Sequence, residues 1–254
     1  MQKHTITALN EINQQFYDAI SAQFSQTRSY AWGGWEVMWE KLSPLLLSDS
    51  DTSAILDVGC GNGRFAQFVS EKLSQFNYLG VDQNIELLEL AERNTLSQIS
   101  NGTVSFREMD VIGSLIDGNF VDNLNGKTFD LIVLFGVLHH IPSLELRQKL
   151  LQVLSTLLSP QGVLIVSCWR FDRNESLFSR RIAPEALQLD SNELEEGDYF
   201  LTWERGVSAT RYCHLTLPAE QDVLARSARL QILGRFSADG KTGMDNDYVL
   251  LRKE

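Results

Sequence analysis

The feature that most limits the fold is an alternation of apolar, strand-like segments with amphipathic, helix-like segments, which begins at Ala54. The strands predicted in this region are 54–58, 78–82, 103–109, 129–135 and 163–168. The segment 129–135 is almost continuously apolar, which is typical of a strand covered on both faces. Strand–helix repeats of this length need crossover connections, so they predict a doubly wound, mostly parallel α/β sheet.

The C-terminal part of the chain adds two more strands to this prediction. A helix near 218–228 is followed by strands at 230–236 and 248–252, which a glycine-containing turn joins. Adjacent late strands of this kind can form an antiparallel edge pair. We therefore expect a seven-stranded sheet, as in Rossmann-like folds, whose last strand is antiparallel.

Composition excludes several classes of protein. The 254 residues fit one large domain, and the net charge of −11 excludes a generic basic nucleic-acid coat but not a local basic patch. Cys60, Cys168 and Cys213 form no short-spaced pair, so neither a disulfide framework nor a metal site is predicted. No run of 18 apolar residues and no apolar signal core occur, and we expect a cytoplasmic protein without a membrane partner.

A glycine-rich loop lies between the first predicted strand and the helix after it. The loop reads Asp57-Val58-Gly59-Cys60-Gly61-Asn62-Gly63. Glycines let the backbone turn tightly and let a ligand approach closely, and the helix N-terminus offers free amides. Asp82 ends the next strand, 19 residues after Gly63, where a carboxylate can accept hydrogen bonds from both ribose hydroxyls of a nucleoside. The loop therefore predicts a nucleoside-containing cofactor.

The acid at the start of the loop separates two such cofactors. The dinucleotide fingerprint G-x-G-x-x-G surrounds a pyrophosphate, whereas this chain has G-x-G-x-G preceded by Asp57. Asp57 would repel a pyrophosphate but could accept a hydrogen bond from a ligand ammonium. S-adenosylmethionine (SAM) carries an ammonium and a sulfonium and no phosphate, so the charge favours SAM over NAD.

From about Ala54 onward the chain resembles the class I SAM-dependent methyltransferases in both motif and order. The resemblance implies that SAM is bound by Asp57, Gly59, Gly61, Asn62, Gly63, Asp82, Gln83, Asp110, Val111 and Phe135. In it, Asp82 is the ribose acid, Gln83 lies beside the adenine, and Asp110 accepts from the adenine amino group. The alternative for Asp110 is a helix N-cap. The segment 112–128 departs from the family because it is longer and less apolar than usual.

The pair His139-His140 follows the fourth strand, at the carboxyl end of the sheet, where such folds bind ligands. We expect one of the two to face the methyl group as a catalytic residue and the other to be structural.

Short motifs outside the core resemble the eukaryotic wobble-uridine tRNA carboxyl methyltransferases. They are Phe16-Tyr17-Asp18, Phe24-Ser25-Gln26-Thr27-Arg28, Trp32, Leu138-His139-His140, Arg211-Tyr212-Cys213-His214-Leu215 and Asn246-Asp247-Tyr248. That family methylates the carboxylate of 5-carboxymethyluridine in the anticodon loop, and its members depend on a small zinc-binding activator subunit. The resemblance thus implies a tRNA anticodon loop as a partner and an activator subunit as a further one.

The chemistry agrees with that resemblance. A carboxylate is ionised near neutral pH and needs orientation rather than a base, which Arg28 and Arg211 could provide. Tyr212 could stack on a base or donate its hydroxyl. The alternatives are ordinary ion pairs for the arginines and ordinary packing for Tyr212.

The predicted organisation is a single methyltransferase domain, 1–254, in four parts. They are an N-terminal helical lid (1–45), a SAM-binding core (46–169), an inserted substrate cap (170–215) and a C-terminal helix with the last two strands (216–254). Arg170, Arg173, Arg180 and Arg181 form a basic cluster in the cap that could contact phosphates or could be a solvated face, although the cap as a whole is net negative. A small-molecule carboxyl, oxygen or nitrogen methyltransferase and a non-catalytic SAM-binding module remain as alternative functions.

Overall fold

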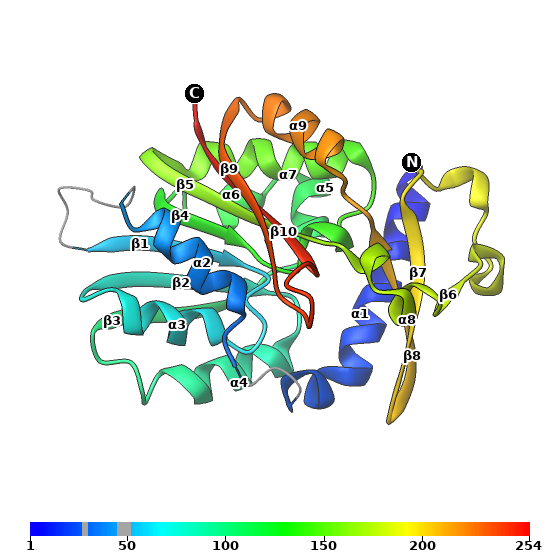
Figure 1. Ribbon diagram of the computed structural model, residues 1–254, viewed down its shortest axis with the longest axis horizontal. Helices are drawn as coiled ribbons and strands as arrows, with labels where there is room; N and C mark the ends of the chain where they lie inside the picture. Colours follow the sequence, from blue (N-terminus) through cyan, green and yellow to red (C-terminus); the bar gives the residue numbers. More distant parts are fainter. Residues whose placement is uncertain (27–29, 45–51) are drawn as a thin grey trace.

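The computed structural model describes residues 1–26, 30–44 and 52–254, and its centre is one twisted sheet (Figure 1). Within these residues, seven strands lie in the order β3-β2-β1-β4-β5-β10-β9. Their bounds are β1 Ser53–Val58, β2 Phe76–Asp82, β3 Gly102–Glu108, β4 Phe129–Leu134, β5 Leu158–Trp169, β9 Leu230–Ala238 and β10 Asn246–Lys253. Strands β1 to β5 are mutually parallel, and β10 is antiparallel to both β5 and β9. The predicted doubly wound sheet with an antiparallel last strand is confirmed.

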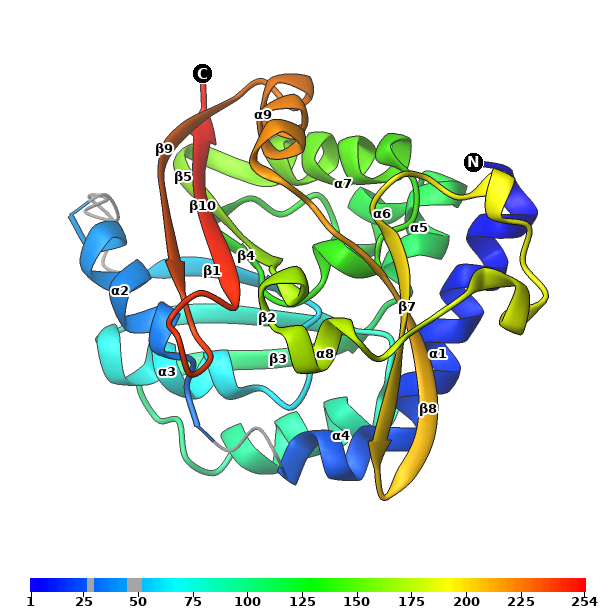
Figure 2. The same ribbon diagram turned by 45° about the vertical axis from the view of Figure 1, so that its right-hand side comes forward.

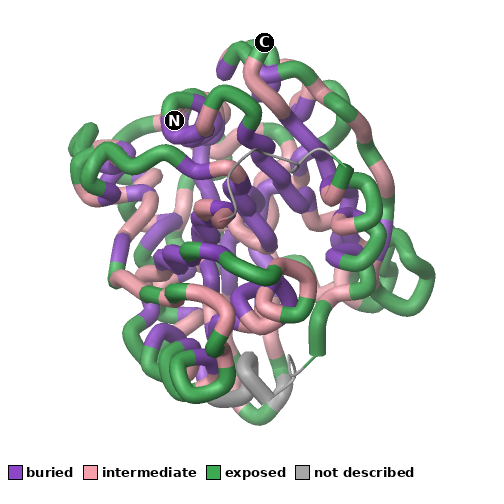
Figure 3. The backbone as a smooth tube through the Cα atoms, turned by 90° about the vertical axis from the view of Figure 1, so that its left-hand side faces the viewer, coloured by how far each residue is buried: buried purple, intermediate pink, exposed green. Residues whose placement is uncertain are grey.

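Helices cover both faces of this sheet because successive residues of the central strands are apolar and point to opposite faces (Figure 1). On one face, Ile55 and Leu131 pack with residues of α2 and α3. On the other face, Leu56 and Ile132 pack with residues of α5, α6, α7 and α9. The helices are α2 Gly33–Leu42, α3 Arg64–Lys72, α4 Ile85–Thr95, α5 Val111–Asp117, α6 Phe120–Asn123, α7 Leu144–Leu157 and α9 Pro218–Ser227. The tube in Figure 3 shows that buried stretches of the chain lie mostly inside the molecule and exposed stretches mostly around its outside.

Local signals set several of the element ends. Ser143 caps α7 by accepting a hydrogen bond from the Leu146 amide, a usual role of serine at a helix start. Helix α3 ends at Lys72, and Phe76 begins β2. Pro160 and Gly162 lie inside β5, where the pairing register with β4 shifts between Phe129 and Leu131.

A second, smaller sheet stands beside the carboxyl ends of the central strands (Figure 2). Its strands are β6 Arg181–Ile182, β7 Asp198–Arg205 and β8 Val207–His214, paired antiparallel in the order β6-β7-β8, and we call it the cap sheet. Helix α1 Lys3–Gln26 runs along β8, and Leu9 of α1 packs against Phe200 and Tyr212 of the cap sheet. Short helices connect these parts: η1 Leu138–His140, η2 Phe171–Arg173, α8 Glu175–Phe178, η3 Pro184–Leu187 and η4 Ser191–Glu193. None of the helices in the described ranges is long and apolar enough to cross a bilayer.

Candidate active site

A cavity of about 790 Å³ lies where the carboxyl ends of β1 and β4 meet α1, α2 and the cap sheet. This is where the strand order reverses, the usual ligand site of a doubly wound sheet. Its walls come from distant parts of the chain: 10–17, 32–35, 57–65, 82–87, 109–112, 135–141, 169–180, 202–211 and 239–246. Most of the residues predicted from sequence therefore gather around one cavity.

The three glycines of the loop have different surroundings. All three have positive φ, at +76° for Gly59, +53° for Gly61 and +78° for Gly63. A Cβ on Gly61 would meet nothing within 4 Å, so its backbone faces open space in the cavity wall. A Cβ on Gly59 would collide with the side chain of Val137.

Gly63 differs from the other two, and its predicted cofactor contact is not what the structure favours. It is the N-cap residue of α3 and does not line the cavity. A Cβ there would lie 3.0 Å from Ala91 of α4. The positive φ and the close approach to α4 account for a glycine at this position without a ligand.

Asp57 is a buried acid in the cavity wall. It is 2% exposed and accepts a hydrogen bond of 2.5 Å from the hydroxyl of Tyr78. Burial raises the pKa of Asp57 to about 7, against the lowering effect of the Tyr78 hydrogen bond. A cationic ligand group nearby would favour the ionised form.

Asp82 lies beside it at the end of β2 and also lines the cavity. Its carboxylate accepts hydrogen bonds from the Gly61 and Asn84 amides, each at 2.9 Å. These bonds fix both the loop and the acid. The carboxylate is thus held against the loop that was predicted to contact the cofactor.

Of the remaining residues predicted to contact the cofactor, four line the cavity and one does not. Asn62, Gln83, Val111 and Phe135 line the cavity. Asp110 does not: it caps α5 by accepting from the Gly113 amide at 3.0 Å, and Asn10 donates to its carboxylate at 3.3 Å. The N-cap alternative for Asp110 is therefore what the structure shows, and its contact with adenine stays a prediction.

His139 and His140 both line the cavity and are both buried. The Nδ1 of His140 lies 3.0 Å from the carbonyl oxygen of Tyr212, and its Nε2 lies 2.8 Å from the hydroxyl of Tyr17. His140 thus connects η1 to α1 and β8, a structural role. The His139 ring packs 5.1 Å from the ring of Trp169.

Arg211 is the cation that lies deepest in the cavity wall. It is 6% exposed, and its guanidinium lies 4.3 Å from the ring centre of Trp169 and 5.2 Å from that of Phe16. Among the described residues no carboxylate is paired with it. Two roles were open for Arg211: an ion pair within the protein, or the orientation of a bound carboxylate. The described residues contain no such ion pair, so an anionic ligand would supply the counter-ion.

Two other residues predicted to contact the acceptor have a different outcome. Arg28 lies outside the described residues. Tyr212 is fully buried, donates to Asp198 at 2.8 Å and does not line the cavity, so the prediction that it touches the acceptor is wrong. The reason is strand alternation: Arg211 and Tyr212 are neighbours on β8 and must point to opposite faces.

Two of the four arginines predicted as a phosphate-binding cluster are neutralised by acids. Arg170 pairs with Asp172 and Asp247 at 2.8 Å each, and Arg173 pairs with Asp247 at 2.9 Å. Only Arg180 of the four lines the cavity. The predicted basic cluster is thus not a single surface.

Trp169 and Asn13 line the cavity although neither was among the predicted site residues. Trp169 ends β5, and a residue at the carboxyl end of a parallel strand is a fair candidate on position alone. Asn13 accepts from the Tyr212 amide at 2.9 Å, a contact between α1 and β8 that only the three-dimensional fold reveals.

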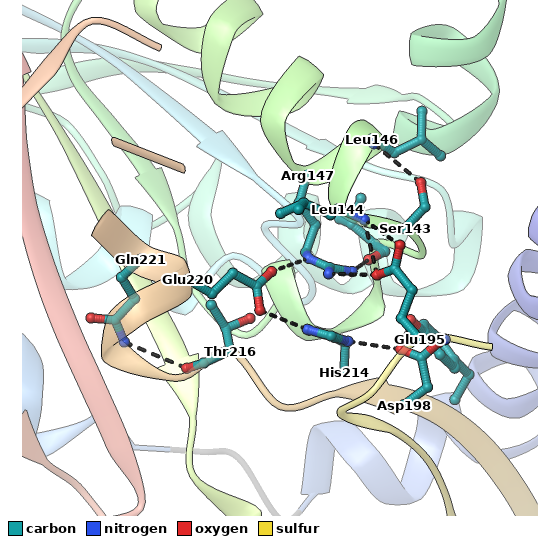
Figure 4. Close-up of polar contacts among 12 residues, drawn as sticks. Ser143, Leu144, Leu146, Arg147, Glu195, Asp198, His214, Thr216, Glu220 and Gln221 are labelled. Carbon is teal, nitrogen blue, oxygen red and sulfur yellow. Dashed lines mark hydrogen bonds and ion pairs between the residues drawn. The ribbon is translucent and has the colours of Figure 1, made fainter. Parts of the chain in front are cut away.

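A buried network of charges holds the cap sheet to the core next to this cavity (Figure 4). Arg147 of α7 is 1% exposed on its side chain and pairs with Glu195 at 2.8 Å and Glu220 at 2.6 Å. His214 of β8 bridges Asp198 at 2.7 Å and Glu220 at 2.8 Å. Burial lowers the pKa of His214, but its two carboxylate partners raise it more, so the pKa lies above its ordinary value.

Two groups of side chains have metal-ligand geometry, His139 with His140 and Cys213, and Glu195 with Asp198 and His214. Both ring nitrogens of His140 and of His214 already have hydrogen-bond partners. We assign no metal to either group.

The cavity fits SAM better than a dinucleotide. The open face of Gly61 allows a close approach, and Asp82 stands where a ribose acid is needed. Asp57 puts a buried acid where a pyrophosphate would lie in a dinucleotide fold, whereas an ammonium would be attracted. Asp57, Gly61, Asp82 and Gln83 would hold the cofactor.

Comparison with known proteins agrees with this fit. Residues 56–164 match the family described as a methyltransferase domain. A SAM-dependent methyltransferase from Clostridium acetobutylicum has a similar structure, with a TM-score of 0.62 and 17% identity over 94% of this chain and 97% of that one.

Two curated relatives are similar in sequence. A probable tRNA methyltransferase 9B from Bos taurus is 25% identical over 186 residues, 71% of this chain and 34% of the relative. The tRNA (carboxymethyluridine(34)-5-O)-methyltransferase of Arabidopsis thaliana is 24% identical over 168 residues, 66% of this chain and 35% of the relative. The chain thus spans about a third of the length of each. The glycine loop, the sheet and these matches show that the chain contains a methyltransferase domain, built on the Rossmann-like fold that SAM-dependent methyltransferases share.

Proposed function

We propose that this protein transfers a methyl group from SAM to a carboxylate, and that the carboxylate belongs to a modified wobble uridine in tRNA. The observation that carries the proposal is Arg211, a buried guanidinium in the cavity wall with no carboxylate partner among the described residues. A buried cation without a counter-ion is costly, and a bound carboxylate would complete it.

The chain has the groups that such a reaction requires. Bound SAM supplies an activated methyl group. A carboxylate acceptor is already ionised near neutral pH, so the protein needs to orient it and to exclude water rather than to remove a proton. Arg211 would hold the carboxylate, and Trp169 keeps the guanidinium in place by stacking on it.

The identity of the acceptor is supported by the relatives. The Arabidopsis relative is named for methylation of carboxymethyluridine in tRNA, and it matches 66% of this chain. Aromatic residues beside Arg211 suit a base as well as a carboxylate: Trp169 and Trp203 both line the cavity.

The test is methyl transfer into a short anticodon stem-loop. The protein is incubated with SAM labelled on the methyl group and with RNA that carries either 5-carboxymethyluridine or uridine at the wobble position. We expect label only in the first RNA, released as methanol by mild base because the product is an ester. Label that resists base, or no label in either RNA, would contradict the proposal.

Net charge favours a second candidate, a small carboxylic acid as the acceptor. At −11 the protein repels polyanions more than a typical RNA-binding protein does. Label that enters the small metabolites of a cell extract, and not its RNA, would support this candidate.

An activator subunit also remains a proposal, which rests on the family resemblance. It predicts that the chain alone is slow with the stem-loop, and that a protein fraction from the source cell increases the rate. A rate that is already independent of any added fraction would contradict it.

A further inference from the structure

Arg180 occupies a special position among the arginines of the cap. It follows α8 and precedes β6, and its side chain lines the same cavity as Arg211. Its neighbour Arg181 stacks on Phe178 at 3.6 Å, and Arg170 and Arg173 pair with acids. In the described part of the chain, no ion pair involves the Arg180 guanidinium.

The backbone at Arg180 is held firmly although its guanidinium is unpaired. Its carbonyl accepts hydrogen bonds from the amide of Thr202 at 3.2 Å and from the hydroxyl of the same residue at 3.3 Å. Thr202 lies on β7 and also lines the cavity. The cap sheet therefore fixes where this arginine enters the cavity wall.

The two cations differ in depth. Arg211 is buried on β8, whereas Arg180 is only half-buried. An acceptor that satisfies both must carry one negative group deep in the cavity and a second one nearer to solvent. A nucleotide within RNA with a carboxylate on its base has this arrangement, because its phosphodiesters are separated from the base by the ribose.

We infer that Arg180 binds a backbone phosphate of the acceptor nucleotide while Arg211 holds its carboxylate. The inference rests on the proposed function and adds a specificity-determining residue to it. A guanidinium can bind phosphate through two parallel hydrogen bonds, so Arg180 would select an acceptor within a polynucleotide over the free nucleoside.

The experiment compares two acceptors in the full-length protein and in two variants. The acceptors are the anticodon stem-loop with 5-carboxymethyluridine and the free 5-carboxymethyluridine nucleoside. The variants are Arg180→Gln and, as a matched control, Arg181→Gln, which removes the adjacent charge that stacks on Phe178. KM and kcat are measured for each pair at several salt concentrations.

We expect Arg180→Gln to raise KM for the stem-loop about tenfold, a typical loss for one good contact, with kcat nearly unchanged. KM for the nucleoside should not change. The slope of log KM against log salt should become shallower by about 0.7, the value for one phosphate contact on a single strand. Arg181→Gln should change none of these, and Arg180→Lys should restore part of the affinity because it keeps the charge.

The outcomes separate this inference from the proposed function. If Arg180→Gln affects nucleoside and RNA equally, or if Arg181→Gln matches it, the phosphate assignment is overturned while carboxylate methylation stands. The same holds if the unmodified protein uses the nucleoside as well as it uses the RNA. If the unmodified protein methylates neither acceptor, the proposed function is overturned and the inference falls with it.

Discussion

At the scale of single residues, we expect Asp57 to make cofactor binding depend on pH. Its pKa of about 7 places the change between neutral and ionised forms within the physiological range. Only the ionised form attracts the ammonium of SAM, so affinity should fall as pH falls through 7. Calorimetry with S-adenosylhomocysteine should show Kd rising by up to about tenfold from pH 8 to pH 6, the factor for one pKa unit.

Two substitutions make this prediction specific. Asp57→Asn should bind weakly at every pH, with little slope. Tyr78→Phe removes the hydrogen bond that lowers the pKa of Asp57, so the midpoint should move to higher pH. A Tyr78→Phe midpoint equal to that of the unmodified protein would contradict the role given to this pair.

Alanine substitutions can distinguish the contributions of the loop glycines to cofactor binding and to stability. Gly61→Ala adds a methyl group to open space, so it should weaken cofactor binding and destabilise the fold only by the cost of positive φ, about 1 kcal/mol. Gly59→Ala must also displace Val137 and should destabilise the fold more. Thermal unfolding and calorimetry together measure both effects.

Gly118→Ala is the matched control, because it has a φ of +75°, has nothing within 4 Å of an added Cβ and lies outside the cavity wall. It should lose stability like Gly61→Ala but bind the cofactor normally. Equal affinities for the Gly61 and Gly118 variants would show that the open space at Gly61 is not a ligand surface.

At the scale of elements, β8 separates two functions onto its two faces. Arg211 points into the cavity, and Tyr212 and His214 join the charge network behind it. The pKa of His214 is raised in the folded state, so its protonation stabilises the fold at low pH. This contribution is complete below its ordinary value near 6.5 and is lost as pH rises through the raised pKa.

We therefore expect the unfolding temperature of the protein to fall above neutral pH, and His214→Gln to lack that part of the decline. Thermal unfolding of both proteins, followed at several pH values between 5 and 9, measures this difference. A decline of the same size in His214→Gln would mean that another group is responsible.

The central sheet and the cap sheet, which contains β8, differ in how well the sequence predicts them. The apolar runs of 54–58 and 129–135 predicted the sheet because burial on both faces leaves a clear pattern. The cap sheet had no such signal: β7 and β8 carry charged residues at Asp198, Glu204 and Arg211, so no continuous apolar run marks them. The sequence motif around Arg211 indicated a site, but not which of its residues lines the cavity.

The sequence indicated the locally encoded part of the cavity most directly. Asp57, Gly61 and Asp82 lie on one strand–loop–helix–strand unit, and all three line the cavity. Asn13 and Trp169 reach the cavity only through the packing of α1 and β5 around it, which no spacing in the sequence records.

At the scale of the whole molecule, Arg147 joins the core to the cap. Arg147→Met would leave the partly buried Glu195 and Glu220 without their shared cation, at a cost of up to about 3 kcal/mol, the lower end of the range for a fully buried pair. We expect unfolding up to about 10 °C lower, from the usual shift per kcal/mol for a chain of this size, and earlier protease cleavage within 170–215.

Arg93→Met provides the comparison. It removes an exposed pair with Glu89, which contributes at most about 1 kcal/mol. Similar losses in the two variants would mean that the buried network does not anchor the cap.

The anchoring of the cap by Arg147, Glu195, His214 and Glu220 bears on how such an enzyme can acquire a new acceptor. Arg147 on α7 and Glu220 on α9 lie outside the cap segment 170–215, which is the part that a chimera would exchange. A chimera that receives only a foreign 170–215 would inherit charges without their counter-ions. Grafting specificity onto this scaffold thus requires the recipient helices to be rewritten together with the transplanted segment.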